Sequence, residues 1–119
     1  MENNSCDTKA LNIETVKEVK SKMANDEIID KLTNFFKVFG DFTRAKLLIA
    51  LLEQELCVSD LANILDRKKS IISHQLKTLK EAKLVKSKKV GRVVYYSLDD
   101  DHVSMILKMA NEHILEKRD

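Results

Sequence analysis

Residue types that mark turns or brace small proteins are scarce in this 119-residue chain. It has no proline and no tryptophan, and only two glycines, Gly40 and Gly91. Because glycine and proline mark most tight turns, their scarcity favours a mainly helical protein. Two cysteines, Cys6 and Cys57, cannot form a disulfide scaffold, and we expect a reducing, cytoplasmic setting. No apolar run is long enough to span a membrane and no signal peptide opens the sequence, so we expect no membrane partner.

Charge is distributed unevenly along the chain. The net charge is +2, but residues 67–92 carry +9 and the remaining residues carry −7. Within that segment the acid Glu81 stands alone against ten lysines and arginines. A solvated helix face mixes both signs, whereas a block of one sign inside a folded domain indicates a polyanionic partner. We therefore predict that this segment binds nucleic acid.

The hydrophobic pattern predicts a short arm followed by one domain. Residues 1–8 show no pattern and are expected to form a flexible N-terminal arm, whereas residues 9–119 are expected to fold together. A chain of this size often gains core by dimerising. Apolar residues at helical spacing predict helices over 9–23, 26–39, 41–52, 58–65 and 69–82.

Local signals define the ends of these elements. Asp26 is expected to cap the second helix and Gly40 to end it. Six apolar side chains of that helix are expected to face inward: Ile28, Ile29, Leu32, Phe35, Phe36 and Val38. Two β-like runs, 85–89 and 92–97, flank Val90-Gly91 and predict a β-hairpin.

The order of these elements predicts the fold class, which is mainly α with a small β-hairpin, arranged as a winged helix-turn-helix. In such a domain the second helix of the motif enters the major groove and the hairpin lies along the DNA backbone. Serine, histidine and glutamine side chains can reach base edges, while lysine and arginine hold phosphates. The candidate DNA contacts are Ser70, Ser73, His74, Gln75, Lys77 and Lys80 on the helix at 69–82, with Lys86, Lys88, Lys89 and Arg92 on the hairpin.

The C-terminal segment carries four residues of metal-ligand type: Asp100, His102, His113 and Glu116. Asp100 is placed to cap a final helix. Eleven residues separate the histidines, which puts both on one helix face but roughly 16 Å apart along the axis, too far for one ion. If the helix crosses an antiparallel copy of itself, Asp100 and His102 of one chain meet His113 and Glu116 of the other, giving two equivalent sites per dimer. The alternative interpretation is that these are polar residues without a metal-binding role on the solvent-exposed side of a dimerisation helix.

Four stretches, taken in order, resemble the ArsR/SmtB family of bacterial metal-responsive repressors: GDFTR at 40–44, ELCVSDLA at 55–62, SIISHQL at 70–76 and GRVVYYSL at 91–98. The resemblance covers roughly residues 26–117. It implies a homodimer, paired through its terminal helices, that binds operator DNA when metal-free and leaves it when metal binds. The C-terminal ligand set matches that of the zinc-sensing branch, which implies zinc as the ligand. Cobalt and nickel are alternatives, and cadmium or lead fit less well.

Two residues before the helix at 69–82 depart from the family pattern. Asp66 stands where glycine is usual, and aspartate adopts the left-handed conformation more readily than most residues. Lys68 replaces the usual serine or threonine cap, which predicts a helix start that is less stable by about 1 kcal/mol.

The resemblance also implies a second candidate metal site, because soft-metal sensors of the family bind metal in this region. It would consist of Cys57 and Asp60 of one chain, with Cys6 from the N-terminal arm of the partner chain. Ser59 stands where those sensors carry a further cysteine, so this site is poorer in thiolate. The competing interpretation is a buried Cys57 and an inert Cys6. The alternative function is therefore a repressor of the same fold that senses a soft metal or a redox change through Cys6 and Cys57. A zinc hydrolase is disfavoured, because the chain lacks His-Glu-x-x-His and a four-ligand site has no open position.

Overall fold

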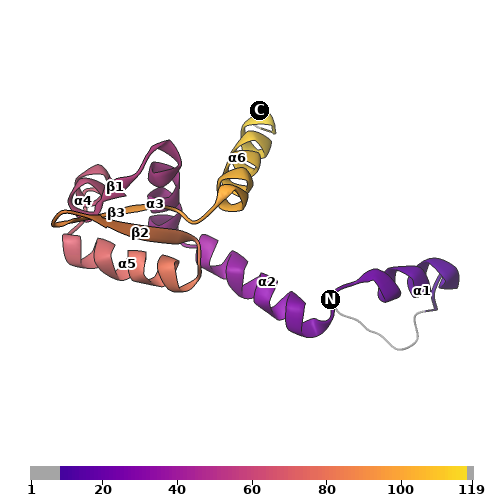
Figure 1. The fold of residues 1–119 in the computed structure, drawn as a ribbon. Coiled ribbons are helices and arrows are strands. Elements are labelled where there is room, and N and C mark those ends of the chain that lie inside the picture. The colour runs from indigo at the N-terminus through magenta and orange to yellow at the C-terminus, as the bar shows by residue number, and fades with distance from the viewer. Residues whose placement is uncertain (1–8, 118–119) are drawn as a thin grey trace. The chain divides into compact units, whose positions relative to one another are not determined.

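The computed structural model describes residues 9–117, which fall into two units that are described separately. The first unit ends at Thr33 and contains α1 (Ile13–Lys22) and the first half of α2 (Asp26–Phe39). The second unit begins at Asn34 and contains the rest of the described chain (Figure 1).

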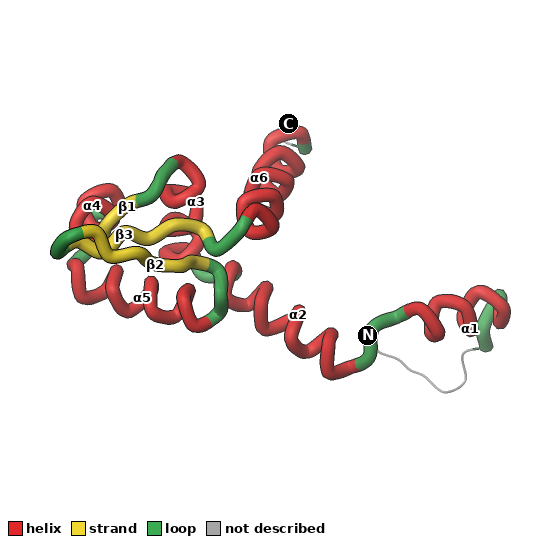
Figure 2. Tube along the Cα trace, viewed as in Figure 1, coloured by secondary structure: helices red, strands yellow, loops and turns green. Residues whose placement is uncertain are grey.

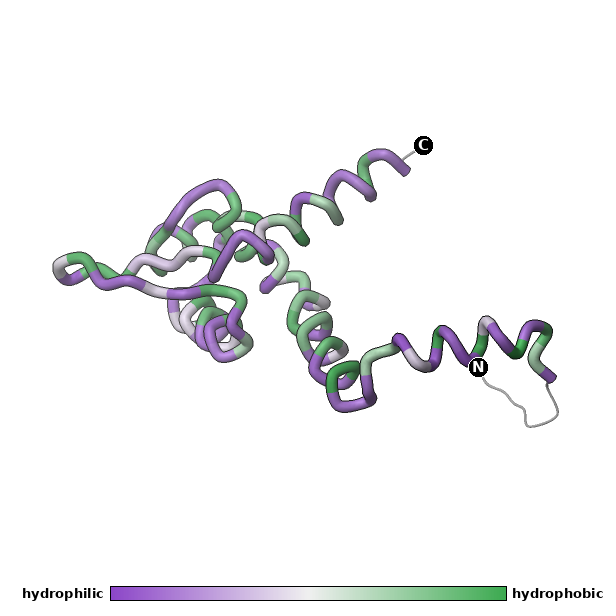
Figure 3. Tube along the Cα trace, turned by 45° about the vertical axis from the view of Figure 1, so that its right-hand side comes forward, coloured by the Kyte–Doolittle hydropathy of each residue, from purple (hydrophilic) through white to green (hydrophobic). Residues whose placement is uncertain are grey.

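The helices are amphipathic rather than apolar throughout. Figure 3 shows hydrophilic and hydrophobic stretches alternating along them. Over residues 9–117, no helix is long and apolar enough to cross a bilayer. The arm expected at residues 1–8 lies outside the described residues.

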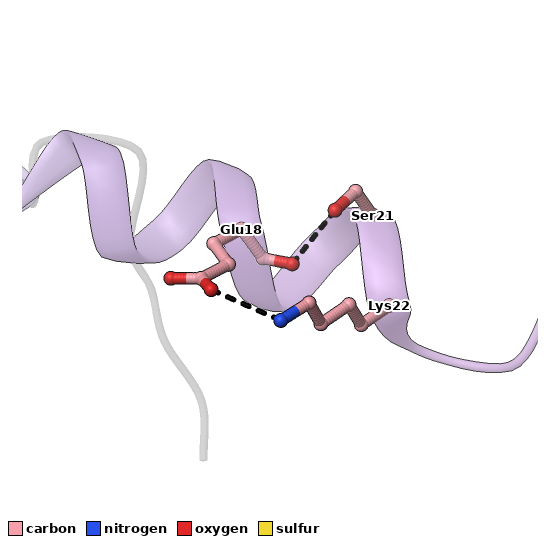
Figure 4. Close-up of polar contacts among 3 residues, drawn as sticks. All are labelled: Glu18, Ser21 and Lys22. Carbon is pink, nitrogen blue, oxygen red and sulfur yellow. Dashed lines mark hydrogen bonds and ion pairs between the residues drawn. The ribbon is translucent and has the colours of Figure 1, made fainter.

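Local interactions stabilise α1. The side chain of Asn12 caps the helix by accepting a hydrogen bond from the Thr15 N–H at 3.1 Å. Glu18, one turn before the end of the helix, makes two further contacts. Its Oε2 lies 3.0 Å from Lys22 Nζ, and its carbonyl accepts a hydrogen bond from Ser21 Oγ at 2.8 Å (Figure 4). An exposed i,i+4 pair of this kind contributes about 0.3–0.5 kcal/mol. The helix spans fewer residues than the predicted range 9–23.

The second helix has the predicted extent but a different cap. Asn25 Oδ1, rather than the Asp26 side chain, accepts a hydrogen bond from the Ile28 N–H at 3.0 Å, so the prediction of Asp26 as the cap is wrong. Asparagine and aspartate are equally good caps, and the position of the first helical turn decides between them. At the other end, the Gly40 N–H donates to the carbonyl of Phe36 at 3.1 Å, and the helix ends at Phe39 as predicted.

The second unit is a winged helix-turn-helix, as predicted, and Figure 2 distinguishes its helices from its strands. After α2, the elements in chain order are α3 (Phe42–Glu53), β1 (Leu56–Cys57), α4 (Val58–Leu65), α5 (Lys69–Glu81), β2 (Val85–Val90), β3 (Val93–Leu98) and α6 (Asp101–Glu116). The strands form an antiparallel sheet in the order β1-β3-β2. The two-residue strand β1 was not anticipated from the sequence.

The wing is a tight hairpin whose strands pair from Val85↔Leu98 to Val90↔Val93. Only Gly91 and Arg92 lie in the loop, one residue later than the predicted turn. Gly91 has φ 63°, in the left-handed region that glycine adopts without strain. The glycine therefore permits the two-residue connection.

The turn between α4 and α5 has the conformation that the sequence predicts. Asp66 has φ 55° and ψ 49°, and its N–H donates to the carbonyl of Asn63 at 3.3 Å. Aspartate can take the place of glycine there because its short polar side chain tolerates the left-handed region. Lys68 occupies the cap position of α5 and makes no side-chain cap hydrogen bond, also as predicted.

The core of the second unit is aliphatic. Leu47, Leu48 and Leu51 of α3 are joined there by ten further buried residues: Leu61, Ala62 and Leu65 of α4, Ile72, Leu76 and Leu79 of α5, Leu84 and Val85 at the base of the wing, and Val103 and Leu107 of α6. Only the first two turns of α6 contribute, because residues 108–117 are all exposed. The core thus fixes α5 and the beginning of α6 in one packed unit.

Replacing Leu48 by alanine is expected to reduce the free energy of unfolding by about 2–5 kcal/mol, since it leaves a cavity in a close-packed core. Leu48 is 0% exposed, whereas the adjacent Ile49 is 44% exposed on the same helix. Ile49→Ala is the matched control, with an expected cost of about 1 kcal/mol or less. Urea unfolding at one fixed protein concentration measures both. Equal costs for the two variants would contradict this placement of the core.

Helices α2 and α6 carry apolar side chains that their own chain leaves exposed. In α2, Ile28, Leu32 and Phe36 are 49%, 52% and 53% exposed, although the sequence predicts that they face inward. Phe35 and Val38 on the same helix do pack against the core of the second unit. In α6, the exposed apolar residues are Met105, Met109, Ile114 and Leu115. Apolar spacing reveals that a helix face is buried, but not whether it is buried by the same chain or by another.

Candidate nucleic-acid interface and metal ligands

Helix α5 presents a polar face opposite its buried one. Ile72, Leu76 and Leu79 are fully buried and hold the helix against α3 and α4. The predicted base-reading residues Ser70, Ser73 and His74 are exposed, as are Lys77 and Lys80. Rigid attachment of one face to the core fixes the direction in which the other face points, which base reading requires.

Gln75 differs from its neighbours because it is half-buried and already has a partner. Its Oε1 accepts a hydrogen bond from Arg44 Nη1 at 3.3 Å, and Arg44 Nε donates to the Val38 carbonyl at 2.9 Å. Sequence reasoning missed Arg44, because its partners lie six and 31 residues away along the chain. Nothing in the local pattern indicates such a contact.

A second contact joins α5 to the wing. Lys80 Nζ donates to Ser87 Oγ of β2 at 2.7 Å. Sequence reasoning assigned Lys80 to phosphate binding and did not single out Ser87. The hydrogen bond places the Lys80 ammonium between the recognition helix and the hairpin.

The hairpin carries the remaining predicted phosphate contacts. Lys86, Lys88, Lys89 and Arg92 are all exposed. Lys88 Nζ lies 3.9 Å from Glu55 Oε2, and their side chains are 65% and 46% exposed. An ion pair this exposed is screened by solvent and contributes little, so Lys88 can exchange Glu55 for a phosphate at small cost.

Two of the four predicted C-terminal metal ligands lie side by side at the start of α6. Asp100 caps the helix, with Oδ1 accepting from the Val103 N–H at 3.2 Å, and its Oδ2 lies 3.4 Å from His102 Nδ1. The Val103 N–H, together with the His102 ring, holds the pKa of Asp100 below its ordinary value, so the carboxylate stays ionised. The side chain of His102 is 88% exposed, which leaves it free to bind an ion or a second chain.

The separation between Asp100 and His102 can be compared with the geometry of a metal site. Two ligand atoms about 2.0–2.1 Å from one tetrahedral zinc ion lie about 3.3–3.4 Å apart. The observed 3.4 Å matches this value, although it is long for a hydrogen bond. The donor set fits zinc, which binds imidazole nitrogen and carboxylate oxygen.

His113 and Glu116 follow near the other end of α6, both exposed and one helical turn apart. Among residues 9–117 of a single chain, no three histidine, cysteine, aspartate or glutamate side chains gather closely enough to hold a metal ion. One chain therefore supplies two separate pairs of candidate ligands.

The start of α6 is joined to the end of the recognition helix by backbone hydrogen bonds. The Asp99 N–H donates to the Leu84 carbonyl at 3.0 Å, and the Leu84 N–H donates to the Leu79 carbonyl at 2.9 Å. Asp99 precedes the candidate ligand Asp100, and Leu79 lies in the last turn of α5. Two hydrogen bonds therefore connect the residue before Asp100 to the last turn of α5.

The second candidate site is represented by two residues at the beginning of α4. Cys57 is a free, half-buried thiol at the cap position, without a side-chain cap hydrogen bond, and Asp60 is exposed in the first helical turn. Cys57 lines a hollow of about 290 Å³ together with Arg92 of the wing loop. Cys6, the third residue of this site, lies outside the described residues.

Comparison with known proteins identifies close relatives over nearly the whole chain. Residues 41–87 match the model of a family described as bacterial regulatory protein, arsR family. The chain is 38% identical over 111 residues to a transcriptional repressor SmtB homolog of Synechocystis sp., covering 93% of this chain and 84% of that protein. It is 37% identical over 114 residues to a cadmium resistance transcriptional regulatory protein CadC homolog of Staphylococcus aureus, covering 95% and 93%.

A structural neighbour agrees with the fold. The homodimeric winged helix-turn-helix DNA-binding domain from Mycobacterium bovis superimposes with a TM-score of 0.73 over 82% of this chain and 94% of that one. At 20% sequence identity, this likeness concerns the fold alone.

Proposed function

The chain belongs to the ArsR family of bacterial transcriptional regulators, and from that premise we propose that it is a cytoplasmic, zinc-responsive repressor that releases operator DNA when zinc binds between the α6 helices of a homodimer. Members of this family are metal-responsive DNA-binding repressors and not enzymes. Zinc, the dimer and the ligand set are the parts of the proposal that go beyond this membership. The observation that carries the choice of zinc is the 3.4 Å separation between Asp100 Oδ2 and His102 Nδ1, which suits two ligands of one tetrahedral ion.

A homodimer accounts for the exposed apolar faces of α2 and α6. Phe36 of α2 and Met109 of α6 are 53% and 65% exposed in one chain, and a hollow of about 410 Å³ along α6 is lined by His102, Met105, Ile106 and Met109. Small domains commonly bury such faces against a second copy. Because His102 borders this apolar hollow, a partner helix that covers the hollow also brings its own side chains next to His102.

The proposed site combines Asp100 and His102 of one chain with His113 and Glu116 of its partner, repeated twice by the two-fold axis. When bound, zinc would supply a bridge that ties the two α6 helices into one arrangement. The residues of the chain then carry the effect to DNA, because Asp100 adjoins Asp99 and the Asp99–Leu84 hydrogen bond leads to the end of α5. A coupling of about 3 kcal/mol would lower operator affinity roughly 150-fold, and operator binding would weaken zinc binding by the same factor.

Operator binding followed by fluorescence anisotropy, during titration with zinc, cobalt, nickel, cadmium and lead, tests the choice of metal. We expect zinc to release the operator most effectively, and cobalt to give a four-coordinate visible spectrum without intense sulfur charge-transfer bands. Strong sulfur-to-metal absorption that Cys57→Ser abolishes and His113→Ala leaves intact would contradict the proposal. That outcome would favour the alternative, a repressor that senses a soft metal or a redox change through Cys6 and Cys57.

Zinc binding is expected to weaken as the pH falls from 7 to 5.5, because protons compete with the metal for imidazole nitrogen. An ordinary histidine gains its proton below a pH of about 6.5. The pKa of Asp100 is lowered from 3.8 by the Val103 N–H, so this carboxylate is lost as a ligand only at a still lower pH and contributes nothing to the change. Isothermal titration calorimetry at several pH values checks this. Zinc affinity that did not change over this range would exclude histidine ligands.

A further inference from the structure

Arg44 lies where three helices of the second unit meet. It belongs to the first turn of α3, where its backbone N–H donates to Asp41 Oδ2 at 3.0 Å. Its half-buried side chain donates from Nε to the carbonyl of Val38 in the last turn of α2 at 2.9 Å. From Nη1 it donates to Gln75 Oε1 of the recognition helix at 3.3 Å. One side chain therefore joins the end of α2 to the middle of α5.

Arginine is chemically suited to this junction. Carbonyls in the last turn of a helix lack partners within the helix and carry partial negative charge, which favours a cationic donor such as the one on Val38 O. The planar guanidinium presents several donors in a fixed arrangement, so one group can bind two acceptors at a set angle. Lysine has the same charge but concentrates it at one flexible ammonium group, and so it cannot reproduce both contacts.

The contact also fixes the orientation of the Gln75 amide. Arginine has only donors, so the atom of the Gln75 amide that faces Arg44 is its oxygen, which keeps a second lone pair, and both N–H donors stay available. Gln75 borders a shallow hollow on α5 of about 370 Å³, together with Ser70, Ile71 and His74. An amide held in one orientation can present a donor and an acceptor together to adenine, or a donor alone to a guanine or thymine oxygen.

We propose that Arg44 is a positioning residue for operator recognition, which orients α5 against the end of α2 and holds the Gln75 amide in one orientation for base contact. This inference rests on the proposed operator binding, and it adds the element that fixes α5, the helix that reads the DNA.

The test uses the full chain and a duplex that the wild-type protein selects from a randomised pool, with a shuffled duplex of the same composition. Arg44→Lys keeps the positive charge and removes the planar guanidinium group with its several donors. It is expected to lower affinity for the selected duplex roughly ten- to hundredfold, the effect of one hydrogen bond to a charged group. Affinity for the shuffled duplex and the salt dependence of binding should stay unchanged, because no phosphate contact is lost. Lys46→Arg, at an exposed position of the same helix, is the matched control and should behave as wild type.

Gln75→Met separates this role from a merely structural one. It removes the acceptor at a half-buried position while keeping the length of the side chain. In the Gln75→Met background, Arg44→Lys should have no further effect on the ratio of selected to shuffled affinity, at a temperature where circular dichroism shows every variant folded. Selection repeated with Arg44→Lys should enrich its preferred bases less strongly than selection with the wild-type protein.

The positioning role would be overturned if Arg44→Lys and Gln75→Met had additive effects on the ratio of selected to shuffled affinity. It would also be overturned if Arg44→Lys left that ratio unchanged. An unchanged base preference in the repeated selection would overturn the orienting effect of Arg44 on Gln75. A wild-type protein that enriches no sequence would instead refute the operator binding on which both roles rest. If Arg44→Lys does not fold, Gln75→Met alone still decides, since a wild-type affinity ratio in that variant contradicts the proposal.

Discussion

His102→Ala and His113→Ala are each expected to abolish zinc binding and zinc-induced operator release, while a mixture of the two variants recovers part of both. In a mixed dimer, one site combines both substitutions. The other combines intact Asp100 and His102 from one chain with intact His113 and Glu116 from its mate. Random pairing makes half of the dimers mixed, so the mixture should bind about a quarter of the zinc that wild type binds. Calorimetry of the variants alone, and after refolding together, measures this stoichiometry.

The third histidine of the chain provides the control for this experiment. His74 is exposed on α5, so His74→Ala should keep the full zinc stoichiometry and change operator preference instead. Both metal-site variants should still bind operator in the absence of zinc, because the core that holds α5 contains neither histidine. If no binding returns in the refolded mixture, the two ligand pairs do not meet across a dimer, and the proposed site is wrong.

Replacing Lys88, Lys89 and Arg92 of the wing together by alanine is expected to weaken binding to every DNA sequence. Each phosphate contact contributes about 0.9 to the slope of log affinity against log salt, so the slope should become shallower by about 2.7. At physiological salt this corresponds to a loss of roughly a hundredfold in affinity. Selected and shuffled duplexes should lose affinity alike, because phosphate contacts carry no sequence information. Anisotropy over a series of salt concentrations measures both quantities.

A change of net charge alone would also affect DNA binding, and a second triple variant controls for it. Lys17, Lys20 and Lys22 are exposed on α1, outside the basic segment, and their replacement by alanine removes the same charge. This variant should retain nearly the wild-type slope. Equal slopes for the two triple variants would show that the wing makes no specific phosphate contacts.

The order of the helices, their approximate ends and the winged architecture follow from the sequence alone. These features depend on interactions between residues close in the chain. The left-handed Asp66, the uncapped Lys68, the cap at Asp100 and the tight loop at Gly91 are all local in this sense. The strongly basic character of residues 67–92 is likewise a property of composition, and it does not depend on how the chain folds.

Strand β1 shows the limit of local signals. Its two residues, Leu56 and Cys57, have no periodicity of their own and become a strand only because Tyr96 and Tyr95 lie opposite them. An isolated pair of residues gains nothing from an extended conformation until a partner strand supplies its hydrogen bonds. Its existence therefore had to be decided by the tertiary structure.

Long-range packing also sets which polar side chains already have a hydrogen-bond partner within the protein. The sequence presented Gln75 and Lys80 as two more members of a DNA-reading face, yet the first accepts a hydrogen bond from Arg44 and the second donates one to Ser87. The same holds for the apolar face of α2, where helical spacing was correct but Ile28, Leu32 and Phe36 remain exposed. Periodicity records that a side chain faces one way along its own helix. What lies on that side is set by segments distant in sequence, whose packing depends on the shape and volume of the whole core.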